Sequence, residues 1–114
     1  MYDPEQIREV VSRCWSVETD AKWLPDNPAR GQCNATSLVV NDLCGGEIRK
    51  TETPGGWHFY NLVAGNRYDL TESQFAAPMN YADVASNRAE ALAGTTASSY
   101  ALLKSRVTML LAER

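Results

Sequence analysis

The sequence lacks several features that would place it in a broad class of proteins. No apolar run approaches the roughly 20 residues that a membrane-spanning helix needs, so we expect no membrane association. The N-terminus, MYDPEQIREVV, carries charges throughout instead of a basic flank and an apolar block, so we expect no secretory leader. Basic residues are not in excess, because 11 Lys and Arg stand against 14 Asp and Glu, and we therefore expect no nucleic-acid partner.

Cysteine and histidine are also scarce. Three cysteines, Cys14, Cys33 and Cys44, cannot all pair within one chain, and His58 is the only histidine. No Cys-x-x-Cys motif occurs and only one histidine could complete a ligand set, so we expect no structural zinc site. We also expect no other cofactor. An odd number of cysteines without a secretion signal is typical of free thiols in a reducing compartment, and we expect a cytoplasmic protein.

The length of the chain limits its organisation. With 114 residues, of which 44% are hydrophobic and 22% charged, the chain is too apolar for disorder and fits a single domain, residues 1–114. Without a disulfide or a metal, the aromatic residues and the apolar helix faces must supply most of the stability. Dimerisation would add to that stability, so the sequence leaves a homodimer open.

Helical signals occur near both ends and in the middle of the chain. The first predicted helix begins after the N-cap Asp3 and runs to about Trp15, and the central one spans Gln32 to Cys44. Gly45 and Gly46 end the central helix. Shorter helical pieces are predicted at 71–74 and 86–94. A C-terminal helix, which we expect to pack on a sheet, carries an apolar face formed by Tyr100, Leu103, Val107, Leu110 and Leu111.

Strand signals lie between the central helix and residue 71. The alternating run 47–53, the aromatic run 57–63 and the short run 67–70 are separated by turns rich in glycine and proline. These patterns predict an antiparallel meander of about three strands. Together with the N-terminal, central and C-terminal helices, the meander predicts an α+β fold.

Cys33 is the candidate nucleophile. It lies in the first turn of the central helix, where unpaired backbone N–H groups and the helix dipole stabilise an anion such as a thiolate. The same N–H groups could bind the oxyanion of a tetrahedral intermediate, with the Gln32 amide or the Trp23 indole as a further donor. Cys14 and Cys44 lack this placement, and we expect them to be packing residues.

His58 and Asp69 are the candidate partners of Cys33. The predicted strands place His58 on the middle strand and Asp69 on the next. An even number of residues in the loop between these strands puts the two side chains on one face, and an odd number puts them on opposite faces. A thiolate, an imidazole and an orienting carboxylate are the groups that acyl transfer needs.

Each of these residues also has a purely structural interpretation. Cys33 could be a small packing residue, and His58 could belong to the aromatic run around Trp57. Asp69 could cap the turn that follows it, and Gly31 could be a simple loop glycine instead of permitting a close approach beside Cys33. A redox function would require Cys33 to lie near Cys14 or Cys44.

Several motifs carry a family resemblance. The segments NPARGQC, VVNDLCGGEIRKT, GWHFYN, RYDLTESQF and SNR resemble the YunG family of small, functionally uncharacterised bacterial proteins. The resemblance extends from about Trp15 through the C-terminal helix. More distantly, the order of Cys33, His58 and Asp69 along the chain is similar to that in papain-like and transglutaminase-like cysteine enzymes, which implies a core of that type.

Two functional hypotheses follow. The first is a cysteine-dependent acyl transfer on a small peptide or amide substrate, as hydrolysis, deamidation or transamidation. In it Cys33 is the nucleophile, His58 the general base and acid, and Asp69 the group that orients His58, while Gln32 assists the oxyanion. The alternative is a non-catalytic interaction domain in which the same residues are structural and exposed aromatic surface around Trp23 and Trp57 binds a partner.

Overall fold

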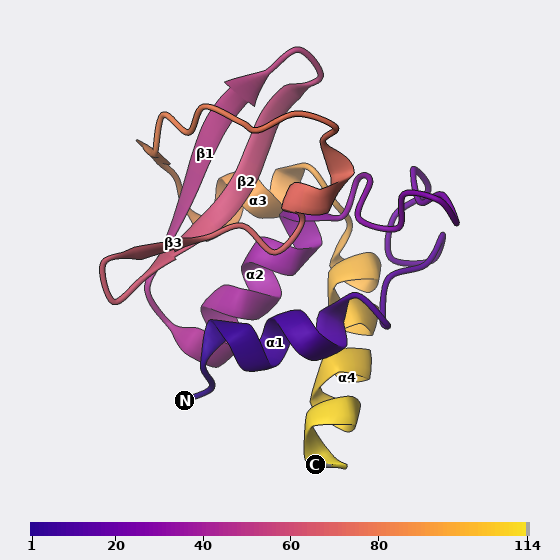
Figure 1. Cartoon of the computed structure of the whole chain (residues 1–114). Coiled ribbons are helices and arrows are strands. Elements are labelled where there is room, and N and C mark those ends of the chain that lie inside the picture. The colour runs from indigo at the N-terminus through magenta and orange to yellow at the C-terminus, as the bar shows by residue number, and fades with distance from the viewer. Residues whose placement is uncertain (114) are drawn as a thin grey trace.

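An antiparallel sheet of four strands forms one layer of the molecule in this computed structural model, which describes residues 1–113. The strands are β1 (Glu47–Thr53), β2 (Gly56–Val63), β3 (Asn66–Tyr68) and β4 (Val84–Ala85), and their order across the sheet is β3-β2-β1-β4. The predicted α+β class and the antiparallel meander of β1, β2 and β3 are confirmed (Figure 1).

The predicted number of strands was too low. β4 pairs with β1 through Arg49↔Ala85 and Lys50↔Val84, at the edge away from β3. Two residues are too short to show the alternation by which a strand is found in a sequence. This strand forms because the segment after β3 crosses back over the sheet, and that path depends on tertiary contacts.

The helices occur close to where the sequence predicts them. They are α1 (Pro4–Val11), α2 (Cys33–Cys44), α3 (Arg88–Ala93) and α4 (Ala97–Ala112), with a 3-10 helix at Glu72–Gln74. Asp3 caps α1 through a capping box with Gln6. α1 ends before the predicted Trp15, because the N–H groups of Arg13 and Cys14 bond to carbonyls three residues back and tighten the chain into turns.

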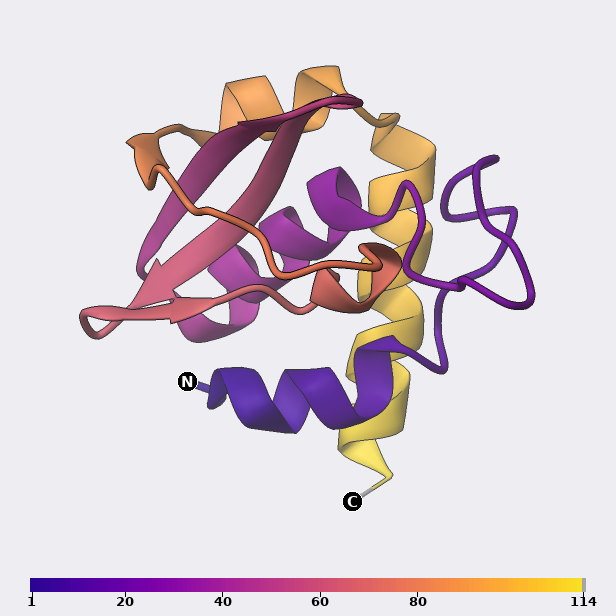
Figure 2. The same cartoon turned by 45° about the horizontal axis from the view of Figure 1, so that its top comes forward.

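α2 is the central helix of the fold. Figures 1 and 2 show it between the sheet on one side and α1 and α4 on the other. The C-terminal helix therefore packs mainly against α2 and α1, and the prediction that it packs on the sheet was wrong. Its apolar face is buried as predicted at Leu103, Val107 and Leu111, but α2 already occupies the sheet face that it would have covered.

Two groups of buried side chains hold these layers together. The larger joins α1, α2 and α4, and the smaller joins the start of α2 to the sheet and α3 through Cys33, Leu38, Ile48, Phe59 and Ala91. The beginning of α2 is thus fixed against β2. No helix within residues 1–113 is both long enough and apolar enough to cross a membrane. A core of the papain-like or transglutaminase-like type stays a prediction.

Candidate active site

Cys33 is the first residue of α2, and the residue is only 8% exposed. Gln32 occupies the N-cap position, but its side chain makes no capping hydrogen bond. Most helices satisfy the N–H groups of the first turn with a Ser, Thr, Asp or Asn side chain at this position. Here those N–H groups remain uncapped beside the Cys33 sulfur, where they favour negative charge.

The register of the sheet brings His58 and Asp69 together. Val63 pairs with Asn66, so the loop between β2 and β3 has two residues, Ala64 and Gly65. This even loop puts His58 and Asp69 on the same face, one of the two outcomes that the sequence left open. Nε2 of His58 lies 2.7 Å from Oδ2 of Asp69, and both side chains are 2% exposed.

Asp69 is held by donors other than His58. Its Oδ1 accepts hydrogen bonds from the backbone N–H and the hydroxyl of Thr71, and its Oδ2 accepts one from the hydroxyl of Tyr81 at 2.8 Å. The carboxylate is therefore buried but fully hydrogen-bonded, which offsets the cost of removing it from water. Phe75 packs edge-on against the His58 ring, with 4.8 Å between centroids.

Tyr81 is a site residue that the sequence analysis did not identify. It lies between the 3-10 helix and β4, in a segment that crosses the His58 face of the sheet (Figure 1). The Thr51 hydroxyl fixes this segment, because it donates to the Asn80 carbonyl and accepts from the Ala82 N–H. The segment has no regular periodicity, so no local pattern could have predicted a contact with Asp69.

The environment of His58 favours its protonated form. Burial lowers the pKa of the imidazole, but hydrogen bonds to Asp69 and Cys33 and the negative charges of these two groups raise it, and the net pKa is about 9. Because Nε2 is engaged by Asp69, Nδ1 is the ring nitrogen left to face the Cys33 sulfur. At neutral pH the site thus holds an imidazolium between a carboxylate and a thiol or thiolate.

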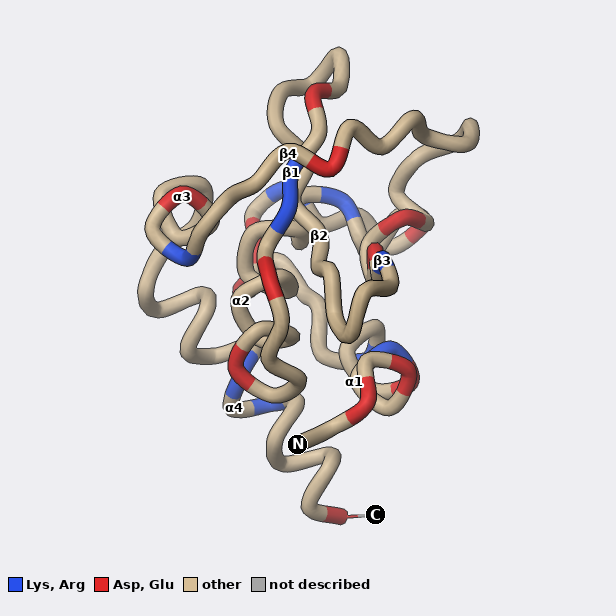
Figure 3. The backbone as a smooth tube through the Cα atoms, turned by 90° about the vertical axis from the view of Figure 1, so that its left-hand side faces the viewer, with Lys and Arg blue, Asp and Glu red and all other residues tan. Residues whose placement is uncertain are grey.

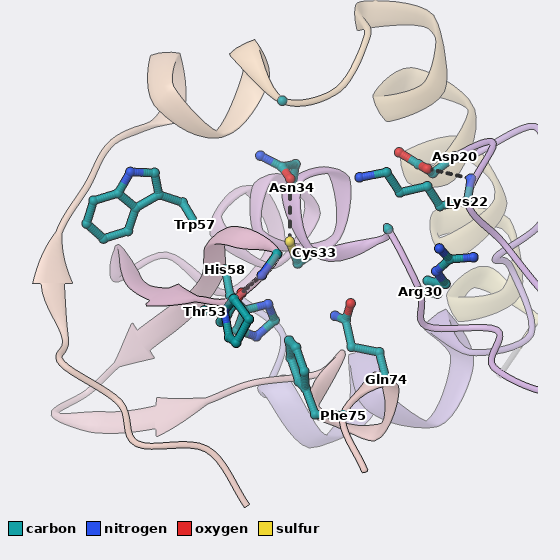
Figure 4. Close-up of a pocket in the computed structure, with 14 residues that line it drawn as sticks. Asp20, Lys22, Arg30, Cys33, Asn34, Thr53, Trp57, His58, Gln74 and Phe75 are labelled. Carbon is teal, nitrogen blue, oxygen red and sulfur yellow. Dashed lines mark hydrogen bonds between the residues drawn. The ribbon is translucent and has the colours of Figure 1, made fainter. Parts of the chain in front are cut away.

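Cys33 and His58 line a common cavity of about 460 Å³. Figure 4 shows the sulfur and the imidazole near its middle, with Trp57 on one side and Lys22 and Arg30 on the other. The Cys33 thiol donates to Oδ1 of Asn34 at 3.4 Å, and the Asn34 amide is anchored to the Ala91 carbonyl of α3. The candidate nucleophile is therefore reachable by a small molecule or an extended chain.

The two predicted side-chain donors for an oxyanion do not line this cavity. Gln32 is fully buried, and its amide accepts a hydrogen bond from the Thr19 hydroxyl at 2.7 Å and donates one to the Arg30 carbonyl. Trp23 packs against the larger core cluster. The backbone N–H groups at the start of α2 are the donors that lie beside the sulfur, and the assignment of Gln32 to the oxyanion stays a prediction.

Gly31 permits a close approach of the chain beside Cys33. Its φ is +77°, and a Cβ atom at this position would lie 2.6 Å from Oδ1 of Asp20 and 2.7 Å from Cβ of Lys22. Neither the backbone conformation nor the space admits another residue. The glycine therefore lets the loop that carries Asp20 and Lys22 pack directly onto the residues preceding α2.

We expect Gly31→Ala to destabilise the fold by about 1–3 kcal/mol, because it places an alanine in the left-handed region of backbone conformation with its Cβ against this loop. Chemical denaturation followed by tryptophan fluorescence measures the change. Gly65→Ala is the matched control, since Gly65 also has a positive φ of +81° but nothing lies within 4 Å of an added Cβ. Equal losses in the two variants would contradict the close packing at Gly31.

Cys14 and Cys44 are packing residues, as predicted. Both belong to the larger core cluster, whereas Cys33 belongs to the smaller one. Burial raises the pKa of Cys14, and it raises that of Cys44 to about 11, so neither favours a thiolate. All three cysteines are free. Within residues 1–113, no group of three or more His, Cys, Asp and Glu side chains is arranged to hold a metal ion.

Comparison with known proteins gives two matches. A family model described as "YunG protein" matches residues 3–112. A Bacillus subtilis (strain 168) protein described as "Uncharacterized protein YunG" is 39% identical over 100 residues, which cover 88% of this chain and 87% of the relative. No solved structure matches the chain.

Proposed function

Because this chain belongs to the YunG family, whose matched relative is described only as uncharacterised, we propose its function from the geometry around Cys33: a cysteine-dependent acyl transfer at an amide. The observation that carries the proposal is the buried His58 and Asp69 pair, with its 2.7 Å hydrogen bond, facing a helix-terminal cysteine in a shared cavity.

The reaction follows from the position of each group. The Cys33 thiolate attacks the amide carbonyl carbon, and the new C–S bond places negative charge on oxygen beside the N–H groups that begin α2. His58 gives its proton to the amide nitrogen as the C–N bond breaks and the amine or ammonia leaves. Water or a second amine then attacks the thioester, gives its proton to His58, and releases Cys33. Water leads to hydrolysis or deamidation, and an amine leads to transamidation.

Asp69 has a positioning role in this scheme. Its carboxylate holds Nε2 of His58 and so directs Nδ1 toward the sulfur, while Thr71 and Tyr81 hold the carboxylate. The negative charge also stabilises the imidazolium that exists before attack and again after the thioester is released.

The rate at which iodoacetamide alkylates each cysteine tests the proposal without a known substrate. We expect Cys33 to react at pH 6 at least about tenfold faster than an ordinary thiol, which is almost wholly protonated at that pH. Cys14 and Cys44 are 2% and 5% exposed and should react only when the protein unfolds. Mass spectrometry of the native protein after timed exposure distinguishes the three sites.

Two variants serve as controls for this measurement. Cys33→Ala should lose the rapidly formed adduct and keep a folded structure, because alanine fills most of the space of a thiol. His58→Gln should keep the adduct but lose the rapid reaction at pH 6. Slow reaction of Cys33 in the native protein would contradict the proposal.

The interaction domain is the rival function, and one observation favours it. Trp57 is 45% exposed at the rim of the cavity, where Lys50 lies over its ring at 4.3 Å. An exposed aromatic side chain is common in binding surfaces. Under this alternative, Cys33 would be alkylated no faster than an ordinary buried thiol, and His58→Gln would leave that rate unchanged.

A further inference from the structure

The cavity around Cys33 has two chemically different ends. Figure 4 shows the Trp57 ring on one side of the sulfur and the side chains of Lys22 and Arg30 on the other. A substrate bound across Cys33 would therefore meet an aromatic surface at one end and positive charge at the other.

Among residues 1–113, the positive charge at this end is not used in ion pairs. Basic and acidic residues are interspersed over most of the chain (Figure 3), and within residues 1–113 seven of the ten Lys and Arg side chains pair with carboxylates. The other three are Arg13, Lys22 and Arg30, and two of these three line the cavity. The net charge of the chain is −3, but these two cations make the surface beside the candidate nucleophile locally positive.

Asp20 also lines this end of the cavity, but its one negative charge is smaller than the sum of the two positive charges there. Its Oδ1 accepts the backbone N–H of Lys22 at 2.8 Å, which shapes the loop. The single carboxylate of Asp20 balances only one of the two positive charges of Lys22 and Arg30, while the charge of His58 is paired with Asp69. The close packing of Lys22 against Gly31 keeps this loop next to the start of α2.

We propose that Lys22 and Arg30 form an anion subsite and that the substrate carries a carboxylate next to the amide attacked by Cys33. This inference rests on the proposed function and specifies its substrate class. The substrate would be an acidic amide, with its carboxylate toward Lys22 and Arg30 and its less polar part toward Trp57. Exposed cations of this kind act through partly screened attraction, so they raise selectivity for an anion rather than creating reactivity.

The ratio of Cys33 alkylation by iodoacetate to that by iodoacetamide measures this selectivity. In both reactions the Cys33 thiolate forms a bond to the methylene carbon and iodide leaves, and the two reagents differ in charge. We expect Lys22→Gln and Arg30→Gln each to lower the ratio by about two- to fivefold, and the double variant by about tenfold. Arg13→Gln is the matched control, since it removes another unpaired cation that lines a different cavity.

Each outcome separates this inference from the proposed function. Rapid iodoacetamide alkylation of Cys33 with a ratio that neither variant changes would overturn the anion subsite and leave the proposed function standing. Slow alkylation of Cys33 by both reagents in the native protein would overturn both. Should a variant fail to fold, the native protein gives a second test. The alkylation ratio should fall as the salt concentration is raised from 0.05 to about 1 M, because salt shortens the distance over which the cations attract an anion. A ratio independent of salt would overturn the subsite.

Discussion

Replacing Asp69 by alanine should destabilise the protein by about 3–5 kcal/mol, because the substitution breaks a buried charge pair and leaves its partners without an acceptor. His58, Thr71 and Tyr81 all donate to this carboxylate. A buried donor that loses its partner costs about 1–3 kcal/mol. Such a loss is a large part of the roughly 5–15 kcal/mol by which a small domain is stable. Urea denaturation followed by tryptophan fluorescence measures it.

An exposed carboxylate provides the control for this prediction. Glu47 pairs with Arg49 at 2.9 Å, but its side chain is 61% exposed. Glu47→Gln should therefore cost less than about 1 kcal/mol. A loss at Asp69→Ala no larger than that at Glu47→Gln would mean that the buried hydrogen bonds around Asp69 are not formed in solution.

Asp69→Asn removes the negative charge and keeps one acceptor oxygen, while its amide nitrogen faces the donors of Thr71. The amide oxygen can still accept from Nε2 of His58, so the ring orientation should survive and the stability loss should be smaller than with alanine. The negative charge is removed, however, and the imidazolium loses part of its stabilisation. We expect the alkylation of Cys33 at pH 6 to slow while the protein stays folded. A purely structural Asp69 would change stability without changing that rate.

The sequence predicted the elements that carry the candidate site because each has a local signal. Cys33 precedes an apolar helical pattern that ends at two glycines, and His58 lies in a run rich in aromatic and β-branched residues, which is typical of a strand. The parity of the loop at Ala64 and Gly65 then reduced the placement of Asp69 to two alternatives, and the register selected one. Local patterns were therefore sufficient to place Cys33 and His58 on their elements, but not to choose the face on which Asp69 lies.

The contacts that complete the site come from segments without such a signal. Tyr81 reaches Asp69 from an irregular crossing segment, and Lys22 reaches the cavity because its loop packs on Gly31. The Gln32 side chain turns inward to Thr19, although its place beside Cys33 in the sequence suggested the cavity. Sequence spacing gives the distance along the chain, whereas these positions depend on how loops pack, which only the tertiary structure determines.

The pKa of His58 should lie far above that of an ordinary histidine, and its titration can be observed directly. Since His58 is the only histidine, its Cε1–H resonance can be followed by NMR without assignment. We expect a midpoint near pH 9 in the native protein, because hydrogen bonds and negative charge at Asp69 and Cys33 outweigh the effect of burial on the pKa. A midpoint near the ordinary value of about 6.5 would contradict the buried pair with Asp69.

The same shift links stability to pH. A folded-state pKa of about 9 exceeds the unfolded value of about 6.5, so the contribution of His58 is fully present below pH 6.5 and is lost as pH rises through 9. The free energy of unfolding should therefore fall by about 3 kcal/mol across this interval. The raised pKa values of Cys44 and Tyr60, about 11 and about 12, affect stability mainly above this interval. His58→Gln should be less stable at pH 6.5 and show little change up to pH 9, and an equally steep fall in that variant would assign the pH dependence to another group.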